Sequence, residues 1–274
     1  MGTRRHRAGC QSVTRRSALA RVDLLVGIDD TDDHWSPGTG RRARALLDEL
    51  TAAGLGTPAG ATRHQLLVDD RIPYTSHNSS ACLAWQSPDA NPDTVRDKVI
   101  ELAGRFLERV CPTDADPGLA VAVPKRLVEY TDAVIDFGRR AKRDVLCLEE
   151  AHQLATDAGV HLSGHGGTRG GVIGALAAIG LQLSGNDGLF ITLPGIRTLP
   201  RASTFEELID ATTIDDARDG EHRRPRPDET IELGDWVRPV LLDGAAVLLL
   251  ESPNQRPDGR RVWRTAPRAV VKQH

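Results

Sequence analysis

The feature that most constrains this chain is an acidic turn that follows a short apolar run near its start. Residues 24–28 (Leu-Leu-Val-Gly-Ile) carry apolar side chains and one glycine, and residues 29–32 (Asp-Asp-Thr-Asp) place three carboxylates within four positions. Such a run predicts a buried strand that ends where the carboxylates begin. Three neighbouring carboxylates are most easily tolerated beside a divalent cation or basic groups. Because ligands collect at the carboxyl edges of sheets, the sequence predicts a ligand site there.

A glycine loop and a helix follow the acidic turn. Residues 36–40 read Ser-Pro-Gly-Thr-Gly, the leucines within residues 41–50 recur at helical spacing, and Gly54 supplies a helix stop. The free backbone N–H groups of a helix N-terminus face anions, so this arrangement suits a metal-bound phosphate. The alternative interpretation is a solvated turn in which the aspartates bond their own backbone.

A second glycine-rich segment lies in the C-terminal half of the chain. Glycines stand at positions 164, 166, 167, 170 and 171, and residues 172–180 form an Ala/Leu/Ile-rich run that predicts a closely packed helix. The spacing matches neither the Walker A motif nor the dinucleotide fingerprint. A glycine loop that leads into a helix can cradle phosphates, and it can equally be a structural loop.

Strands and helices alternate between these two segments. Strands are predicted at residues 62–68, 81–85 and 119–123, and the apolar spacing of residues 93–110 predicts an amphipathic helix. This order suits part of a ferredoxin-like α+β layer. Further helices are predicted at 125–140, 146–155 and 205–209, and a strand at 190–193.

The C-terminal part is more charged and less regular. Residues 215–230 include Arg-Arg-Pro-Arg-Pro at 223–227 and predict a linker, either solvated or in contact with nucleic acid. Short strand patterns between Gly, Pro and Asp turns then predict a small β-rich appendage over residues 231–274.

Composition indicates an ordinary soluble protein. The 274 residues contain 35 Lys plus Arg and 38 Asp plus Glu, a net charge of −3, so the bulk charge does not indicate nucleic acid. The four cysteines form no Cys-x-x-Cys pair, which argues against a zinc ribbon or a secreted disulfide framework. No run approaches the roughly 18 apolar residues of a membrane span. We therefore expect a cytoplasmic protein with a disordered basic tail at residues 1–20.

Four segments resemble the archaeal isoleucine-tRNA agmatidine synthases, which use ATP to activate the wobble cytidine and then replace its oxygen with agmatine. The similar segments are the acidic signature at 27–32, the stretch with Pro73, Tyr74, Asn78 and Ala81, the Asp-Pro-Gly turn at 116–118, and the glycine loop followed by Ile-Gly-Ala-Leu-Ala-Ala-Ile-Gly at 173–180. The resemblance implies an α+β fold, in which a kinase-like α/β catalytic domain stands beside a ferredoxin-like domain and a small β-rich C-terminal appendage. The implied divisions are a tail at 1–20, catalytic parts at 21–61 and 125–214, a ferredoxin-like domain at 62–124, a linker at 215–230 and the appendage at 231–274.

The resemblance also implies roles for individual residues. Magnesium on the ATP phosphates would be held by Asp29, Asp30 and Asp32, with Thr39 and Arg41 as further catalytic residues. Nucleotide contacts would come from the two glycine loops, namely Thr31, Gly38, Gly40, Gly164, Gly166, Gly167, Arg169 and Gly170. Substrate contacts would come from Arg71, Tyr74, His77 and Asn78.

The chain departs from the family pattern at three points. A gapless match from Gly38 places Arg41 where the family has a threonine that becomes phosphorylated, with Thr39 two residues earlier. Ser76 and His77 replace the usual Arg and Gly, and nothing resembles the zinc ribbon. Three hypotheses follow: an ATP- and Mg²⁺-dependent enzyme that activates tRNA for an amine, the same chemistry on a small metabolite, and a non-catalytic RNA-binding protein. No membrane partner is expected, and the sequence does not specify an oligomeric state.

Overall fold

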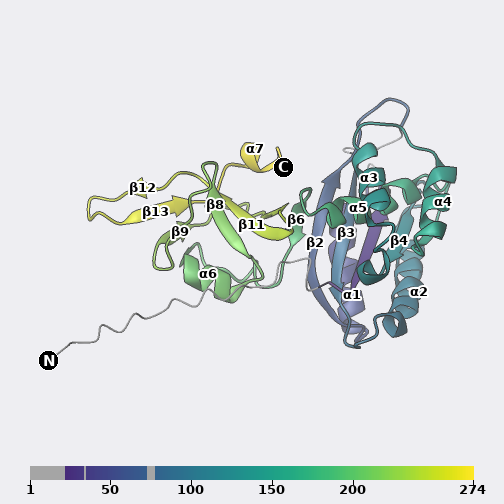
Figure 1. Ribbon diagram of the computed structural model, residues 1–274, viewed down its shortest axis with the longest axis horizontal. Coiled ribbons are helices and arrows are strands. Elements are labelled where there is room, and N and C mark those ends of the chain that lie inside the picture. The colour runs from purple at the N-terminus through teal and green to yellow at the C-terminus, as the bar shows by residue number, and fades with distance from the viewer. Residues whose placement is uncertain (1–21, 34, 73–77) are drawn as a thin grey trace.

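A nine-stranded mixed sheet runs through the computed structural model, which describes residues 22–33, 35–72 and 78–274 (Figure 1). Its strand order is β5-β4-β1-β3-β2-β6-β10-β11-β8. The strands are β1 (Leu24–Asp29), β2 (Thr57–Gln65), β3 (Ser79–Gln86), β4 (Gly118–Ala122), β5 (His161–Gly164), β6 (Leu189–Thr192), β8 (Asp216–Asp219), β10 (Val240–Leu242) and β11 (Ala245–Leu250).

Helices cover both faces of the first half of this sheet. On one face lie α1 (Thr39–Ala52) and α2 (Asp93–Val110), and on the other lie α3 (Thr131–Arg140), α4 (Leu148–Asp157) and α5 (Gly171–Ser184). Successive residues of β1 point to opposite faces, so Leu24 packs in the α1/α2 core and Leu25 in the α3/α5 core. This double cover explains why every residue of β1 is buried.

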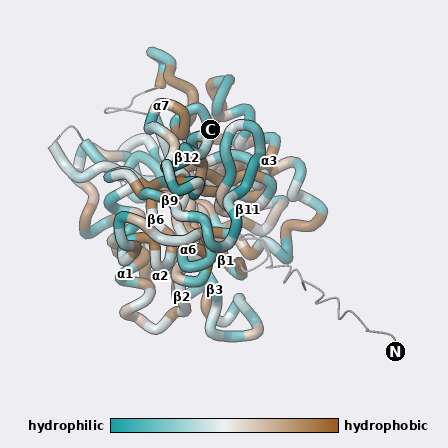
Figure 2. The backbone as a smooth tube through the Cα atoms, turned by 90° about the vertical axis from the view of Figure 1, so that its left-hand side faces the viewer, coloured by the Kyte–Doolittle hydropathy of each residue, from teal (hydrophilic) through white to brown (hydrophobic). Residues whose placement is uncertain are grey.

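The C-terminal lobe adds a second, four-stranded sheet. Its strand order is β12-β13-β9-β7, and it packs with β8, β10 and β11 around the buried Trp263. The indole Nε1 of Trp263 donates a hydrogen bond of 2.8 Å to the buried Glu229 carboxylate. The remaining elements are η2 (Pro124–Arg126), β7 (Ala202–Thr204), α6 (Phe205–Ala211), β9 (Thr230–Glu232), β12 (Asn254–Gln255), β13 (Arg261–Arg264) and α7 (Arg268–Val271). Figure 2 views the molecule from the side of this lobe, with largely hydrophilic chain around β12.

Helix α5 touches β1 with almost no space between the two backbones. A Cβ atom added at Gly27 would lie 2.0 Å from the carbonyl oxygen of Ala175, and one added at Gly174 would lie 1.8 Å from Asp29 Oδ2. Only glycine permits this approach at both positions. The contact brings the start of α5 against the acidic end of β1.

Most elements agree with the sequence predictions. The predicted helix at 93–110 is α2, and strands are confirmed close to 81–85, 119–123 and 190–193. The helix predicted from residue 41 begins earlier, at Thr39, and the helix predicted at 125–140 is η2 followed by the shorter α3. The predicted strand 62–68 is shifted, because β2 begins at Thr57 and ends at Gln65.

The predicted linker at 215–230 is wrong, because it contains β8, which pairs in parallel with β11. Its acidic side chains do not need solvent: Asp219 pairs with Arg223, and Asp216 pairs with Arg224 at 2.9 Å. The appendage is likewise larger than residues 231–274, since β7 and β8 belong to the same lobe.

The expected mixed α+β fold is confirmed, but not its finer subdivision. Strand β2 runs through the predicted boundary between residues 61 and 62, and β1 lies between β4 and β3 in one sheet. Residues 21–61 and 62–124 therefore share a core where separate catalytic and ferredoxin-like layers were predicted. Among the described residues, no helix has the length and apolar character needed to cross a membrane. The predicted tail at 1–20 lies outside the described residues.

Candidate functional site

A cavity of about 400 Å³ opens at the carboxyl end of β1. The acidic turn, the start of α5, the end of β2 and the segment after α3 contribute its walls. Its lining includes Asp29, Asp30, Asp32, Thr39, Leu66, Arg71, Ile72, Asn78, Ser79, Asp114, Asp116, Ala141, Asp144, Val145, Leu146, Gly167, Thr168, Gly170, Gly171, Ile173 and Gly174. The two glycine-associated segments predicted to bind phosphate therefore face one cavity.

The acidic turn is held in an unusual backbone conformation. Asp29 ends β1 and is buried, and Asp30 adopts a left-handed φ of 50°. Aspartate and asparagine tolerate this region better than most residues, and such outliers cluster at functional sites. Burial raises the pKa of Asp29 to about 8, with Asp30 and Asp32 adding to the effect. Burial, and then the charges of Asp116 and Asp32, raise the pKa of Asp30 to about 6.

Thr39 lies inside the cavity at the first turn of α1. Its hydroxyl donates a hydrogen bond of 2.9 Å to Asp32 Oδ1 and accepts one of 3.2 Å from the hydroxyl of the buried Thr31. Arg41 is exposed and lies outside the cavity lining. Of the two residues predicted to act near the family's threonine position, the structure brings only Thr39 to the acids.

The second glycine loop already holds an anion, and that anion belongs to the protein. The Asp116 carboxylate accepts hydrogen bonds from the backbone N–H groups of Arg169 at 2.6 Å and Gly170 at 2.8 Å, and from the Thr168 hydroxyl. These are the donors that a phosphate would use at a helix N-terminus. The sequence suggested Asp116 only as part of an Asp-Pro-Gly turn, so its role in the loop was missed.

Other predicted residues divide between the cavity and its surroundings. Gly167, Gly170, Arg71 and Asn78 line it. Asn78 is fixed by a 2.6 Å hydrogen bond from its Nδ2 to the Leu67 carbonyl, and Arg71 is bound to Asp69. Predicted residues outside the lining are Thr31, Gly38, Gly40, Gly164, Gly166 and Arg169. Tyr74 and His77 lie outside the described residues.

The cavity has a polar end and an apolar end. Its apolar wall comes from the end of β2, the segment after α3 and the start of α5. Among the described lining residues Arg71 is the only cationic one, against six aspartates, so the cavity carries negative charge. Such a cavity favours a cation or a metal-bound anion over a free anion. The apolar wall consists of Leu66, Ile72, Ala141, Val145, Leu146 and Ile173.

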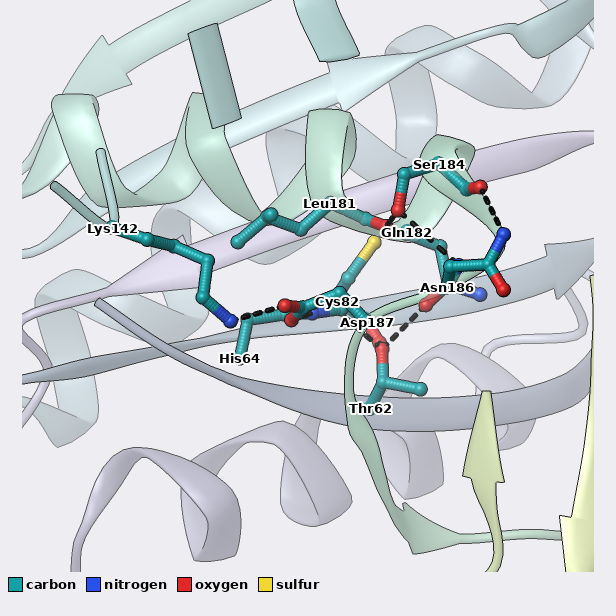
Figure 3. A network of polar contacts seen from close by, with 9 residues as sticks. All are labelled: Thr62, His64, Cys82, Lys142, Leu181, Gln182, Ser184, Asn186 and Asp187. Atoms are coloured by element: carbon teal, nitrogen blue, oxygen red, sulfur yellow. Dashed lines mark hydrogen bonds and ion pairs between the residues drawn. The ribbon is translucent and has the colours of Figure 1, made fainter. Parts of the chain in front are cut away.

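A buried polar network anchors this apolar wall (Figure 3). Lys142, next to the lining residue Ala141, pairs with Asp187, whose other oxygen is 3.0 Å from Nδ1 of the fully buried His64. His64 Nε2 lies 2.9 Å from the Thr62 hydroxyl, which donates to Gln182 of α5. Burial alone would raise the pKa of Asp187, but its contacts with His64 and Lys142 hold that pKa below its usual value. The network ties the wall segment to β2 and α5.

The acids fit a magnesium ion only together with another ligand. Within the described part of the chain, no three His, Cys, Asp or Glu side chains are grouped to hold a metal by themselves. Mg²⁺ usually takes one or two carboxylates and completes its shell with substrate phosphates and water. The pKa values of Asp29 and Asp30 are raised when no cation is near, so a bound cation would stabilise their ionised forms. Their hard oxygen atoms therefore suit that arrangement.

The raised pKa of Asp29 predicts a pH effect on stability. In the folded state Asp29 keeps a proton that the unfolded chain releases, so the free energy of unfolding of metal-free protein should fall as pH rises from about 4 to about 8. The Asp29→Asn variant should lack this contribution, which is on the order of a few kcal/mol. Urea unfolding at several pH values measures the difference between the two proteins. Parallel pH profiles for both proteins would contradict the assignment.

The fold and cavity define a mixed α+β protein with an acidic cavity lined partly by glycines. No family model matches the chain. Curated relatives do: the isoleucine-tRNA 2-agmatinylcytidine synthetase TiaS of Methanosarcina mazei is 30% identical over 174 residues, which are 62% of this chain and 38% of the relative. The Methanosarcina acetivorans synthetase is 28% identical over 163 residues, 59% of this chain and 36% of the relative.

Solved structures that match part of the chain are of the same kind of protein, with TM-scores below 0.5. A complex of TiaS with isoleucine tRNA and ATP has a TM-score of 0.48 and 23% identity, covering 58% of this chain and 36% of that one. A complex of TiaS with isoleucine tRNA, AMPCPP and agmatine has a TM-score of 0.48 and 21% identity, covering 69% and 44%. The curated relatives confirm the resemblance to the agmatidine synthases over about 60% of the chain, while the chain spans less than two fifths of their length.

Proposed function

We propose that this chain is an ATP- and Mg²⁺-dependent enzyme that phosphorylates a substrate oxygen, which an amine then displaces. The observation that carries the proposal is the shared cavity, in which the acidic turn of β1 and the glycine loop before α5 face each other. The curated relatives are isoleucine-tRNA 2-agmatinylcytidine synthetases, which supports tRNA as the acceptor. With ATP and tRNA as substrates, the proposed reaction belongs in the cytoplasm.

Asp29, Asp30 and Asp32 would hold the magnesium ion. When bound, the ion would neutralise charge on the ATP phosphates and orient them for in-line transfer. The chain's own part is to hold these carboxylates in place, by the left-handed backbone at Asp30 and by the glycine surface of α5 behind Asp29. The apolar wall would exclude water and accept the face of a base.

Thr39 is the residue we assign as phosphoryl acceptor. Its hydroxyl already donates to Asp32, which is the arrangement of a nucleophile beside a general base. Thr39 Oγ would bond to the γ-phosphorus while the bond to the ADP oxygen breaks, and the hydroxyl proton would pass to Asp32. The phosphoryl group would then move to the acceptor oxygen, which an amine displaces with release of phosphate. The acidic lining, including Asp114 and Asp144, would attract a cationic amine.

Substitutions at Thr39 and Arg41 test this assignment. Thr39→Ala should lower turnover of γ-labelled ATP at least about 100-fold, because the acceptor oxygen is lost. At a saturating concentration of transcript, Arg41→Gln should leave turnover within about threefold, because Arg41 lies outside the cavity lining. Labelled phosphate release from purified protein, Mg²⁺, a tRNA transcript and agmatine measures both.

Two results would separate the alternatives. ATP turnover that depends on a metabolite pool and ignores the transcript would replace tRNA with a small acceptor. Protein boiled before the assay gives the background of ATP breakdown without enzyme. If wild type and Thr39→Ala both stay at that background, the chain has no ATP turnover and the enzymatic proposal fails.

A further inference from the structure

Six arginines line the α1 face of the central sheet outside the cavity. Arg63 is opposite Leu189 in the β2–β6 pairing, and Leu189 lies in the small core that also contains Val240 and Val271 of α7. Ile191, two residues along β6, packs on the α1 side, so this face continues from α1 to α7. The arginines on this face, called the arginine band below, are Arg41, Arg44, Arg63, Arg197, Arg238 and Arg268.

The arginines of the band influence one another. Burial and then the charges of Arg197 and Arg41 lower the pKa of Arg44, despite the opposing charge of Asp48. Burial and then Arg44 and Arg197 lower the pKa of Arg238. These shifts mean that the side chains of the N-terminal half and the C-terminal lobe are close enough to repel.

Within the described chain, no member of the arginine band lies in an ion pair with a carboxylate. Arginines elsewhere do: Arg109 pairs with Glu49 at 2.6 Å, and Arg256 with Glu232 at 3.0 Å. Two band members are instead turned toward neutral groups, since Arg238 donates to the Ile191 carbonyl and Arg63 to the Ser79 hydroxyl at 2.9 Å. Arg63 and Arg238 are partly buried, and the charges that act on them come from other arginines, which is costly unless an anion joins them.

The shape of the band favours a long polyanion. It extends from the first turns of α1 across β2 and β6 to α7, where Arg268 stacks over the Trp236 ring at 5.3 Å. The chain as a whole carries a net charge of −3, so the unpaired arginines of this face are not part of an overall positive charge. Arg63 contacts Ser79, which lines the cavity, and the band therefore reaches the cavity rim.

We infer that the arginine band binds the sugar-phosphate backbone of RNA and that the C-terminal lobe serves as half of this RNA-binding surface. Guanidinium forks match phosphate oxygens, and the partly buried Trp236 ring beside Arg268 offers an edge for base stacking. A backbone bound along the band would deliver a nucleotide to the cavity rim at Ser79. This inference deepens the proposed function by locating its RNA partner, and it gives the C-terminal lobe a role.

Binding without nucleotide or metal tests the inference separately from catalysis. The probe is a fluorescently labelled tRNA transcript in EDTA, titrated with the full chain over a range of salt concentrations. The test variant is the triple Arg44→Gln, Arg197→Gln and Arg268→Gln. The control is the triple Arg105→Gln, Arg256→Gln and Arg260→Gln, which removes the same charge from exposed arginines that pair with acids.

The test variant should bind at least about tenfold more weakly than wild type, with a log–log salt slope smaller by about 2, because three phosphate contacts are lost. The control should stay within about twofold. Equal weakening in both triples, or displacement of the transcript by poly-glutamate as effective as by unlabelled RNA, would overturn the inference. Near-wild-type melting temperatures would confirm that the variants fold. If the band fails while Thr39-dependent ATP turnover persists, the proposed function stands without it.

Discussion

The Asp30→Asn variant should lose ATP turnover by at least about 100-fold while its metal-free form becomes more stable. The loss follows because Asn cannot supply the negative charge that we assign to magnesium binding on the phosphates, an electrostatic effect worth several kcal/mol. The gain follows because Asp30 has its pKa raised to about 6 by burial, Asp116 and Asp32, so at pH 7.5 its ionised form costs the folded state. Asparagine also tolerates the left-handed φ of 50° at this position.

Asp33→Asn provides the matched control for Asp30→Asn. Asp33 belongs to the same acidic stretch but lies outside the cavity lining, and it accepts hydrogen bonds from the N–H groups of Trp35 and Ser36. Its substitution should leave turnover within about threefold and lower the melting temperature slightly. Labelled ATP turnover and calorimetry on all three proteins provide the comparison. If Asp33→Asn lost ATP turnover without losing stability while Asp30→Asn stayed fully active, the assignment of Asp30 to magnesium binding would be wrong.

Local pattern was sufficient wherever a segment's own side chains decide its structure. The amphipathic spacing of Val95, Val99 and Phe106 predicted α2, and the apolar run before Asp29 predicted β1. The charge of the acidic turn is unfavourable without a partner, which predicted a ligand site there, and the turn does line the cavity. That prediction depended only on three aspartates within four positions and on the strand before them.

The sequence did not show which side chains the fold brings together as hydrogen-bond or ion-pair partners. Asp116 fills the glycine loop before α5, although β4 and β5 separate the two segments along the chain. The charges of residues 215–230 suggested solvent, yet Asp219 is buried because Arg223 of the same segment satisfies it. A linear pattern records a charge but not the group that neutralises it, so both the loop's anion and β8 were missed.

The close contact between the backbones of β1 and α5 gives the second large effect, a loss of stability in Gly27→Ala. The new Cβ would lie 2.0 Å from the Ala175 carbonyl oxygen and 3.3 Å from Ile179 Cγ1. Neither atom can rotate away easily, because one is backbone and both belong to the buried face of α5. Overpacking of this kind costs about 3 kcal/mol or more, and we expect a fall in melting temperature of roughly 6–12 °C.

Gly220→Ala is the control, since nothing lies within 4 Å of its added Cβ and the chain there has no left-handed φ. Its melting temperature should stay within about 2 °C of wild type. If Gly27→Ala is too unstable to purify, its yield of refolded protein from urea, compared with the control, supplies the measurement. Equal stability of the two variants would show that α5 can move away from β1. The glycine surface could then not be what holds Asp29 in the cavity, because the same helix places Gly174 against that carboxylate.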